Sequence, residues 1–284
     1  MITSPLRYPG GKAKLFEYFT EVVKENGLFK STYCEPYAGG AGLALRLLST
    51  GFVERIVLND IDESIYAFWK SVLQAPDEFC RLIDSIPVTI DEWFKQKEIW
   101  NLRDTENPLQ LGFAAFFLNR TNRSGIIEGA GPIGGYEQKG EWAIDVRMNK
   151  VQLIKNIQCI KAFSGRISAT NDDAIHFVER QFANEGTLCY LDPPYYVKGS
   201  KLYRNFYVHS DHCDIKNVLC NNRNARWVVS YDDAPEIREI YCDFEPISYY
   251  LNYSAGKKAT GCEVIYFSDS LEAPDVTGFK RGAA

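Results

Sequence analysis

A carboxylate, a stiff turn and an aromatic ring stand together at residues 192–195, Asp-Pro-Pro-Tyr. They follow residues 187–191, a short uncharged run that predicts a buried strand, and the two prolines prevent this strand from pairing further. Asp192 and the carbonyl of Pro193 both accept hydrogen bonds, while Tyr195 offers a flat face. These groups suit a planar ring with an exocyclic amine, because two acceptors can hold the amine while the ring stacks on tyrosine. The alternative is a polar turn at a strand end with a surface tyrosine.

The chain upstream predicts a strand, a glycine turn and a helix in direct succession. The strand covers residues 32–35, the turn 36–42 and the helix 43–49, an arrangement that commonly holds a nucleotide-like ligand. A second strand, residues 55–58, ends beside Asp60. Because an acid at the tip of the second strand often binds a ribose diol, Asp60 is a candidate for that contact. The pattern fits either a dinucleotide or S-adenosylmethionine.

Two residues favour S-adenosylmethionine over a dinucleotide. Leu45 occupies the position at which the dinucleotide fingerprint needs its third glycine. Glu35, beside the turn, matches a cationic ligand better than a pyrophosphate. Nearer the start of the chain, Tyr8 and Lys12 flank two glycines with an aromatic face and a cation, and this segment does not match the Walker A pattern. We therefore expect a sulfonium cofactor.

Composition restricts the class of protein. The 284 residues are 45% hydrophobic and 24% charged, which is typical of a globular chain that can bury a large core. No apolar run approaches the roughly 18 residues of a membrane-spanning helix, and the N-terminus lacks the apolar core of a signal peptide. Eight cysteines without a C-x-x-C pair predict reduced thiols in the cytoplasm, and neither a metal site nor a disulfide framework.

Charge is distributed unevenly along the chain. The net charge of −5 argues against nonspecific coating of nucleic acid but is compatible with a local basic groove. Residues 191–226 hold six basic and three acidic side chains, and Lys198 and Lys201 come shortly after the Asp-Pro-Pro-Tyr turn. These two lysines are candidates for phosphate contacts. A solvated surface face is the alternative.

The order of elements predicts an α/β protein with a helical insertion. Residues 1–70 and 162–284 alternate strands with helices, as in a Rossmann-like sheet, whereas residues 71–161 are mostly helical. The tail after Ser270 is expected to be frayed. Further helices are predicted at residues 13–26, 90–102, 108–118, 149–160 and 211–222, with another that ends near residue 182, and further strands at 167–170, 227–230, 249–253 and 263–267.

A polar loop follows the second of the helices predicted for the insertion. In it Arg120, Asn122 and Arg123 could reach phosphates and base edges of a nucleic acid. A glycine-rich stretch, residues 129–135, comes next. The alternative is a flexible surface loop.

Five segments, taken in order, resemble the DNA adenine methylase (D12 class) family of N6-adenine-specific DNA methyltransferases. They are residues 7–12 (Arg-Tyr-Pro-Gly-Gly-Lys), 35–42 (Glu-Pro-Tyr-Ala-Gly-Gly-Ala-Gly), 59–60 (Asn-Asp), 119–125 (Asn-Arg-Thr-Asn-Arg-Ser-Gly) and 192–195 (Asp-Pro-Pro-Tyr), and the likeness spans about residues 5–268. The resemblance implies a Rossmann-like methyltransferase sheet that binds S-adenosyl-L-methionine, with residues 71–161 as an inserted target-recognition domain.

The resemblance also implies roles for individual residues. Tyr8 and Lys12 would contact the cofactor, and Asp60 would bind its ribose. Asp173 would receive the cofactor's adenine amine, although Asp172 fits the same place, and Asp192 would lie between cofactor and target base. The methionine part of the cofactor would lie against Glu35, Pro36, Ala38 and Gly40.

The implied reaction is direct methyl transfer to N6 of an adenine in double-stranded DNA. The base must leave the helix, at a cost of a few kcal/mol. Tyr195 would stack on it, while Asp192 and Pro193 would orient N6 toward the sulfonium methyl. Neither a nucleophilic residue nor a metal is implied. The residues implied to contact DNA are Arg120, Asn122, Arg123, Lys198 and Lys201.

Several alternatives stay open on the sequence. An N4-cytosine methyltransferase would share the fold and cofactor, and Asp192 at the first motif position favours adenine. A non-catalytic nucleic-acid-binding relative is disfavoured by the intact Asp192, Tyr195, Asp60 and Lys12. A nicotinamide dehydrogenase would need the missing glycine. Glu128 and the glycines after it depart from relatives that methylate GATC, which puts that target in doubt. The oligomeric state and any cognate restriction endonuclease are not determined by the sequence.

Overall fold

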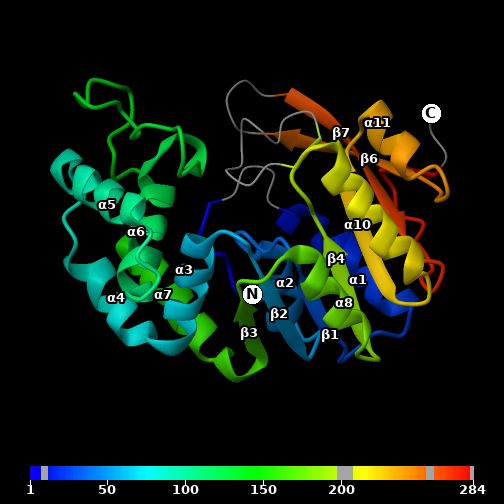
Figure 1. Cartoon of the computed structure of the whole chain (residues 1–284). Coiled ribbons are helices and arrows are strands. Elements are labelled where there is room, and N and C mark those ends of the chain that lie inside the picture. The colour runs from blue at the N-terminus through cyan, green and yellow to red at the C-terminus, as the bar shows by residue number, and fades with distance from the viewer. Residues whose placement is uncertain (8–11, 197–206, 254–258, 282–284) are drawn as a thin grey trace.

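An eight-stranded sheet forms the centre of the computed structural model, which describes residues 1–7, 12–196, 207–253 and 259–281, with the backbone alone at 251–253 and 259–260 (Figure 1). Its order is β3-β2-β1-β4-β5-β7-β6-β8. The strands β3, β2, β1, β4 and β5 pair in parallel, and β7, β6 and β8 join antiparallel. The predicted α/β class is confirmed. The strands are β1 (Thr32–Glu35), β2 (Arg55–Asn59), β3 (Ile167–Thr170), β4 (Thr187–Leu191), β5 (Arg226–Asp232), β6 (Ile247–Tyr253), β7 (Ala259–Phe267) and β8 (Phe279–Arg281).

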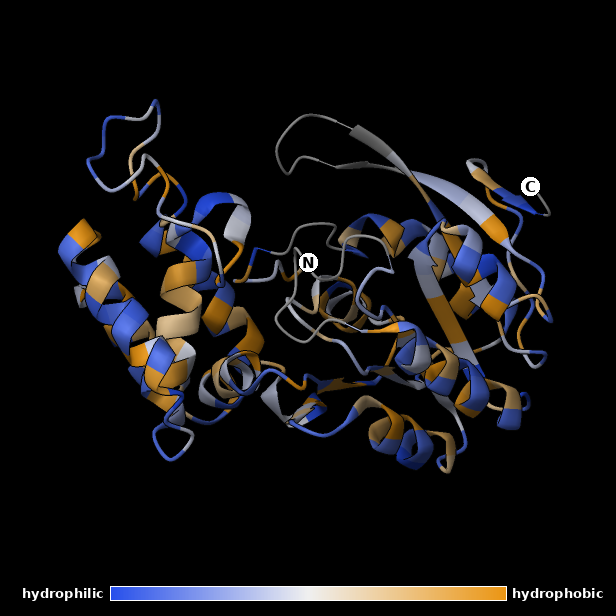
Figure 2. Ribbon diagram, turned by 45° about the horizontal axis from the view of Figure 1, so that its top comes forward, coloured by the Kyte–Doolittle hydropathy of each residue, from blue (hydrophilic) through white to orange (hydrophobic). Residues whose placement is uncertain are grey.

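Helices cover both faces of the sheet because the strands alternate their apolar side chains between two cores. On β4, Leu188 and Tyr190 pack into one core, and Cys189 and Leu191 pack into the other. Figure 2 shows hydrophobic residues concentrated in the strands and on stripes of the helices. The first core includes α1 (Phe16–Glu25) and α2 (Gly42–Ser49), and the second includes α8 (Ala174–Phe182), α10 (His209–Asn221) and α11 (Pro235–Ile240).

A group of helices lies beside the β3 edge of the sheet (Figure 1). It consists of α3 (Glu63–Gln74), α4 (Pro76–Ser85), α5 (Ile90–Leu102), α6 (Pro108–Thr121) and α7 (Lys150–Lys161). The helices predicted in the insertion are confirmed as α5, α6 and α7. The expected start of the insertion at residue 71 falls inside α3, which continues to Gln74, so no break between elements marks that boundary. None of the helices in the described residues is long and apolar enough to cross a membrane.

The contact between α3 and α6 depends on a glycine. A Cβ added to Gly112 would lie 2.5 Å from backbone atoms of Ala67 and Phe68 on α3. We expect Gly112→Ala to lower the free energy of unfolding by about 1–3 kcal/mol, because the two helices must move apart. Urea unfolding followed by circular dichroism measures the loss. Gly165→Ala is the control, since a Cβ there meets no described atom within 4 Å; equal losses in both variants would contradict the packing argument.

The C-terminal segment differs from the frayed tail that the sequence predicted. β8 pairs with β6, with Phe279 opposite Tyr249. The Phe279 ring stacks on the rings of Tyr18 and Tyr249, at centroid distances of 3.8 Å and 5.0 Å. These aromatic contacts come from residues far away in the chain, so no local pattern reveals that the tail has a partner.

The carboxyl ends of β1, β2 and β3 are joined by one buried side chain. Asn59, which is 1% exposed, ends β2. Its amide nitrogen donates to the carbonyls of Pro36 and Asp172, each at 3.0 Å, and its oxygen accepts from the Thr170 hydroxyl at 2.7 Å. The loops that carry the predicted cofactor-binding residues are therefore held together at one edge of the sheet, where open α/β proteins bind their ligands.

Candidate active site

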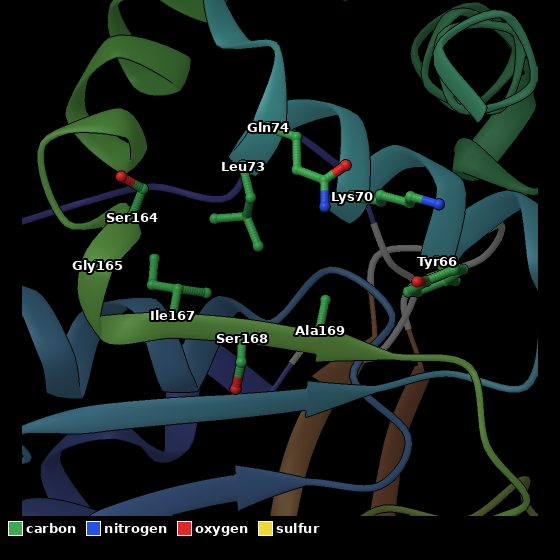
Figure 3. Close-up of a pocket in the computed structure, with 9 residues that line it drawn as sticks. All are labelled: Tyr66, Lys70, Leu73, Gln74, Ser164, Gly165, Ile167, Ser168 and Ala169. Atoms are coloured by element: carbon green, nitrogen blue, oxygen red, sulfur yellow. The ribbon is translucent and has the colours of Figure 1, made fainter. Parts of the chain in front are cut away.

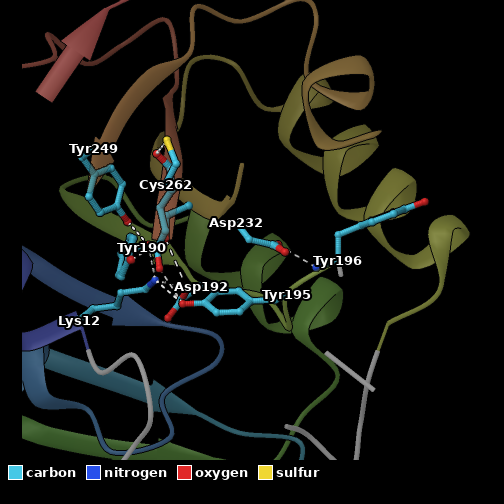
Figure 4. Close-up of polar contacts among 10 residues, drawn as sticks. Lys12, Tyr190, Asp192, Tyr195, Tyr196, Asp232, Tyr249 and Cys262 are labelled. Atoms are coloured by element: carbon cyan, nitrogen blue, oxygen red, sulfur yellow. Dashed lines mark hydrogen bonds and ion pairs between the residues drawn. The ribbon is translucent and has the colours of Figure 1, made fainter. Parts of the chain in front are cut away.

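Asp192 directly follows β4 and lies in a charged cluster (Figure 4). Its Oδ1 is 3.2 Å from Nζ of Lys12, the first residue of the 3-10 helix η1 (Lys12–Leu15), and accepts a hydrogen bond from the Ser230 hydroxyl at 3.4 Å. The side chain is 26% exposed, so a substrate can approach it. Burial raises the pKa of Asp192 to about 6; Lys12 opposes this shift, and Glu263 adds to it.

Glu263, on β7, is the acceptor at the centre of this cluster. Its side chain is fully buried and accepts hydrogen bonds from Nζ of Lys12 and the hydroxyl of Tyr195, each at 2.7 Å, and from the hydroxyl of Tyr249 on β6. Sequence reasoning missed this residue. A signal was present, because Glu263 opens the otherwise apolar strand run of residues 263–267, and a buried acid requires a partner.

Tyr195 and Pro193 are both buried beside Asp192. The Tyr195 hydroxyl lies 3.3 Å from Nζ of Lys12 and donates to Glu263, and its ring centroid is 5.2 Å from the same ammonium. The position of this tyrosine is thus fixed by its hydroxyl group. Stacking of its ring on a target base stays a prediction.

Glu35, the last residue of β1, is a buried acid with few compensating contacts. Glu35 accepts hydrogen bonds from the Tyr33 hydroxyl at 3.0 Å and from the backbone amide of Ala44 at 3.2 Å. Burial raises its pKa to about 8. In the turn that follows, Gly39 and Ala41 adopt positive φ, 45° and 47°. Pro36, Ala38 and Gly40 are buried in the same turn.

Asp60 supports the same turn from the end of β2. Its Oδ2 accepts the Gly39 amide at 2.8 Å, and its Oδ1 accepts the Asp62 amide at 3.0 Å. Burial raises the pKa of Asp60 to about 7. The structure therefore brings Asp60 and the glycine turn together, as the sequence predicted, and the ribose contact stays a prediction.

The two acids after β3 have different environments. Asp173 caps α8, with Oδ1 accepting the amides of Ile175 at 2.9 Å and His176 at 3.3 Å. Asp172 forms an ion pair with Arg180. Asp173 is exposed and Asp172 half-buried, so the choice between them for an adenine amine is not decided by burial.

The structure corrects the expectation that Asn122 contacts DNA. This side chain is fully buried. Its oxygen accepts the indole N–H of Trp93 at 2.7 Å, and its nitrogen donates to the carbonyls of Ile126 at 2.8 Å and Ile127 at 3.2 Å. Asn122 therefore shapes the loop from inside and is not presented to a ligand.

The other residues predicted to contact DNA divide into three cases. Arg123 is exposed. Arg120 is half-buried and donates to the carbonyl of Arg147 at 2.8 Å; burial and the neighbouring Arg7 and Arg147 lower its pKa to about 10. Arg120 therefore has a structural role through its contact with the Arg147 carbonyl. Lys198 and Lys201, like the cofactor candidate Tyr8, lie outside the described residues.

Asn119 begins the segment 119–125, but the sequence suggested no role for this residue by itself. It is fully buried; its oxygen accepts the Arg7 amide at 2.7 Å, and its nitrogen donates to the carbonyls of Arg7 at 2.7 Å and Gly125 at 2.8 Å. The N-terminal segment is thereby fastened to the end of α6, just before the chain reaches Lys12.

A pocket of about 420 Å³ lies elsewhere, between α3 and the edge strand β3 (Figure 3). It contains none of the predicted site residues, so we do not assign the reaction to it. The residues that line it are Tyr66, Lys70, Leu73, Gln74, Ser164, Gly165, Ile167, Ser168 and Ala169.

Three relatives show similarity to much of this chain. Modification methylase StsI of Streptococcus sanguinis is 25% identical over 69% of this chain and 29% of its own length. Type II methyltransferase M.MjaIII of Methanocaldococcus jannaschii is 24% identical over 67% of this chain and 68% of its own length. A DNA N-6-adenine-methyltransferase of Escherichia phage P1 is 22% identical over 84% of this chain and 31% of its own length. The chain thus spans about a third of the length of two of these relatives.

The model of one family matches residues 8–254, a range that contains Lys12, the glycine turn, Asp60 and the Asp-Pro-Pro-Tyr turn but ends before Glu263. Its description is the D12 class N6 adenine-specific DNA methyltransferase. The match agrees with the geometry, in which the Asp-Pro-Pro-Tyr turn and the glycine turn lie at the ends of adjacent strands β4 and β1. The chain belongs to the D12 class N6 adenine-specific DNA methyltransferase family.

Proposed function

We propose that this chain transfers the methyl group of S-adenosyl-L-methionine to N6 of an adenine that is flipped out of double-stranded DNA. The observation that carries the proposal is the position of Asp192. It lies at the end of β4, partly exposed, and β4 pairs directly with β1, the strand that leads into the glycine turn. Asp192, which would hold the target amine, and the glycine turn, which would hold the cofactor, therefore lie at the ends of neighbouring strands. Direct transfer between two bound molecules requires such an arrangement.

The residues of the glycine turn fit a cationic cofactor. Glu35 is buried with a pKa of about 8, and none of the ion pairs among the described residues involves it. A positively charged ligand would favour its ionised form and be attracted by it. S-adenosylmethionine, when bound, supplies a methyl group on a positively charged sulfur. In the proposal Glu35, Pro36, Ala38 and Gly40 hold its methionine part, Asp60 its ribose and Asp173 its adenine.

The target amine is held by acceptors on the Asp-Pro-Pro-Tyr turn. Lys12 and Ser230 both contact Oδ1 of Asp192, so we assign the N6 hydrogen to Oδ2, and the second N6 hydrogen to the Pro193 carbonyl. These two acceptors direct the nitrogen lone pair toward the methyl group. In the transfer a new N–C bond would form while the bond between that methyl carbon and the sulfonium sulfur breaks and leaves a neutral thioether. The amine would become positive, and ionised Asp192 would stabilise it until one proton leaves for water.

DNA contact is proposed for Arg123 and for Lys198 and Lys201, with Arg120 in a mixed role. Phosphate contacts of this kind make affinity fall with salt concentration. The name of one relative, modification methylase, supports the further proposal that a restriction endonuclease of the same specificity is a partner.

Removal of Asp60 tests the cofactor part of the proposal. We expect Asp60→Ala to weaken S-adenosylmethionine binding by about 10- to 100-fold, the size of a lost hydrogen bond to a charged group. Isothermal titration calorimetry measures the dissociation constant. Asp275→Ala, which removes an exposed aspartate, is the control. An unchanged dissociation constant in Asp60→Ala would remove this residue from the cofactor site.

Expression of the chain in a bacterial host without DNA methyltransferases tests the whole proposal. Mass spectrometry of the host nucleosides should detect N6-methyladenine, and sequencing of the modified DNA would locate the site. Detection of N4-methylcytosine in place of N6-methyladenine would overturn the assignment of the base.

A further inference from the structure

We propose that Glu263 is a positioning residue for methyl transfer, which holds the Lys12 ammonium and the Tyr195 hydroxyl so that Lys12 fixes Asp192 and the Tyr195 ring stays beside the target site. This inference rests on the proposed function. It concerns a residue on β7, outside the five segments that carry the family resemblance. We call Lys12, Asp192, Tyr195, Tyr249 and Glu263 the Lys12 network.

The contacts place Glu263 behind the residues that would meet substrate. Lys12 lies 2.7 Å from Glu263 and 3.2 Å from Asp192, so one ammonium links the two carboxylates. The Tyr195 hydroxyl donates to the second oxygen of Glu263 at 2.7 Å. Glu263 thus accepts from Lys12 on one carboxylate oxygen and from Tyr195 on the other.

Burial explains why these contacts would position side chains firmly. The Glu263 side chain is 0% exposed and that of Lys12 is 5% exposed, whereas Asp192 keeps 26% of its surface exposed. A lysine is long and flexible, and an ammonium held by only one partly exposed acid would have several rotamers open to it. The buried partner removes that freedom. Tyr249 donates a further hydrogen bond to Glu263 and so orients the carboxylate.

Glu263 also acts on the charge of Asp192. The two carboxylates share one ammonium, and the negative charge of Glu263 raises the pKa of Asp192. Without the Glu263 charge this contribution would be lost, and the pKa of Asp192 would fall. The groups that face Asp192 from the elements around it are Lys12 (η1), Glu35 (β1), Tyr190 (β4), Ser230 (β5), Tyr249 (β6) and Glu263 (β7).

Glu263→Gln tests the inference, with Glu92→Gln as the matched control. Glu92 is also buried and accepts a hydrogen bond, from Gln96 at 2.8 Å, but lies on α5 in the helical group. We expect kcat for methyl transfer to fall by about 10- to 100-fold in Glu263→Gln, the effect of a small displacement of reacting groups. KM for S-adenosylmethionine should change less, and Glu92→Gln should keep kcat within about twofold of wild type.

A second readout does not depend on activity. Carbon-13 NMR of the aspartate carboxyl groups in the cofactor-free protein should show a lower pKa for Asp192 in Glu263→Gln than in wild type. The acid limb of the pH profile of kcat/KM should move to lower pH in the same direction. An unchanged pKa together with an unchanged kcat would overturn the inference.

Glu263→Asp separates position from charge and serves if the glutamine variant does not fold. The negative charge remains, but the aspartate side chain is one methylene shorter. The pKa of Asp192 should therefore stay close to the wild-type value, while kcat should fall by at least about tenfold. Wild-type kcat in this variant would contradict the positioning role. If wild type itself transfers no methyl group, the proposed function fails; if it does and the Glu263 variants match Glu92→Gln, only this inference fails.

Discussion

Asp192→Ala is expected to lower kcat for methyl transfer by about 1,000-fold and to leave the fold intact. Its carboxylate is the group assigned to accept the N6 hydrogen and to stabilise positive charge as the N–C bond forms, and the loss of one such preorganised group costs about 100- to 1,000-fold. Transfer of labelled methyl groups in reactions quenched at fixed times measures kcat, and circular dichroism reports the fold. Asp275→Ala is the control for loss of an exposed aspartate. Turnover within tenfold of wild type would contradict the role of Asp192.

The same residue sets a pH dependence in the wild-type protein. The pKa of Asp192 is raised to about 6, so below that pH the carboxyl group is protonated and loses its acceptor charge. We therefore expect kcat/KM to fall as pH decreases through about 6 and to reach its maximum at pH values well above 6.

Lys12→Met is the second substitution with a large expected effect. Lys12 is the ammonium that lies between Asp192 and Glu263, and its side chain is 5% exposed. Removing it takes this ammonium away from two carboxylates, which should lower the free energy of unfolding at pH 7 by about 3 kcal/mol or more. Because Lys12 lowers the pKa of Asp192, its loss should also raise that pKa and move the acid limb of kcat/KM to higher pH.

The measurement for this variant is a pair of profiles against pH, one of urea stability and one of kcat/KM. Lys24→Met is the control, because Lys24 pairs with Glu21 on the exposed side of α1. Opposite shifts of the acid limb in Lys12→Met and Glu263→Gln would show that both act through Asp192. An acid limb that stays at the wild-type pH in Lys12→Met would contradict the electrostatic account.

Much of the candidate site could be predicted from the sequence because its residues follow strands. Glu35, Asp60 and Asp192 each come at or just after the end of a short apolar run, and parallel strands deliver such residues to one edge of a sheet. For these residues, local pattern and strand direction were sufficient.

Residues that depend on distant partners could not be predicted in the same way. Glu263 reaches the site because β7 pairs antiparallel with β5, a register that the sequence does not display. Asn122 lies in an arginine-containing polar loop, which suggested a surface role, but its partner Trp93 comes from another helix. β8 is held by the rings of Tyr18 and Tyr249, which lie far from it in the chain.

Methyl transfer by the purified chain to a defined base tests the central claim most directly. Wild type and Asp192→Ala would each be incubated with S-adenosylmethionine labelled in its methyl group and with unmethylated duplex DNA, and the nucleosides would then be separated. We predict label in N6-methyladenine for wild type and almost none for Asp192→Ala. Label in N4-methylcytosine, or equal labelling by both proteins, would contradict the proposed reaction at this site.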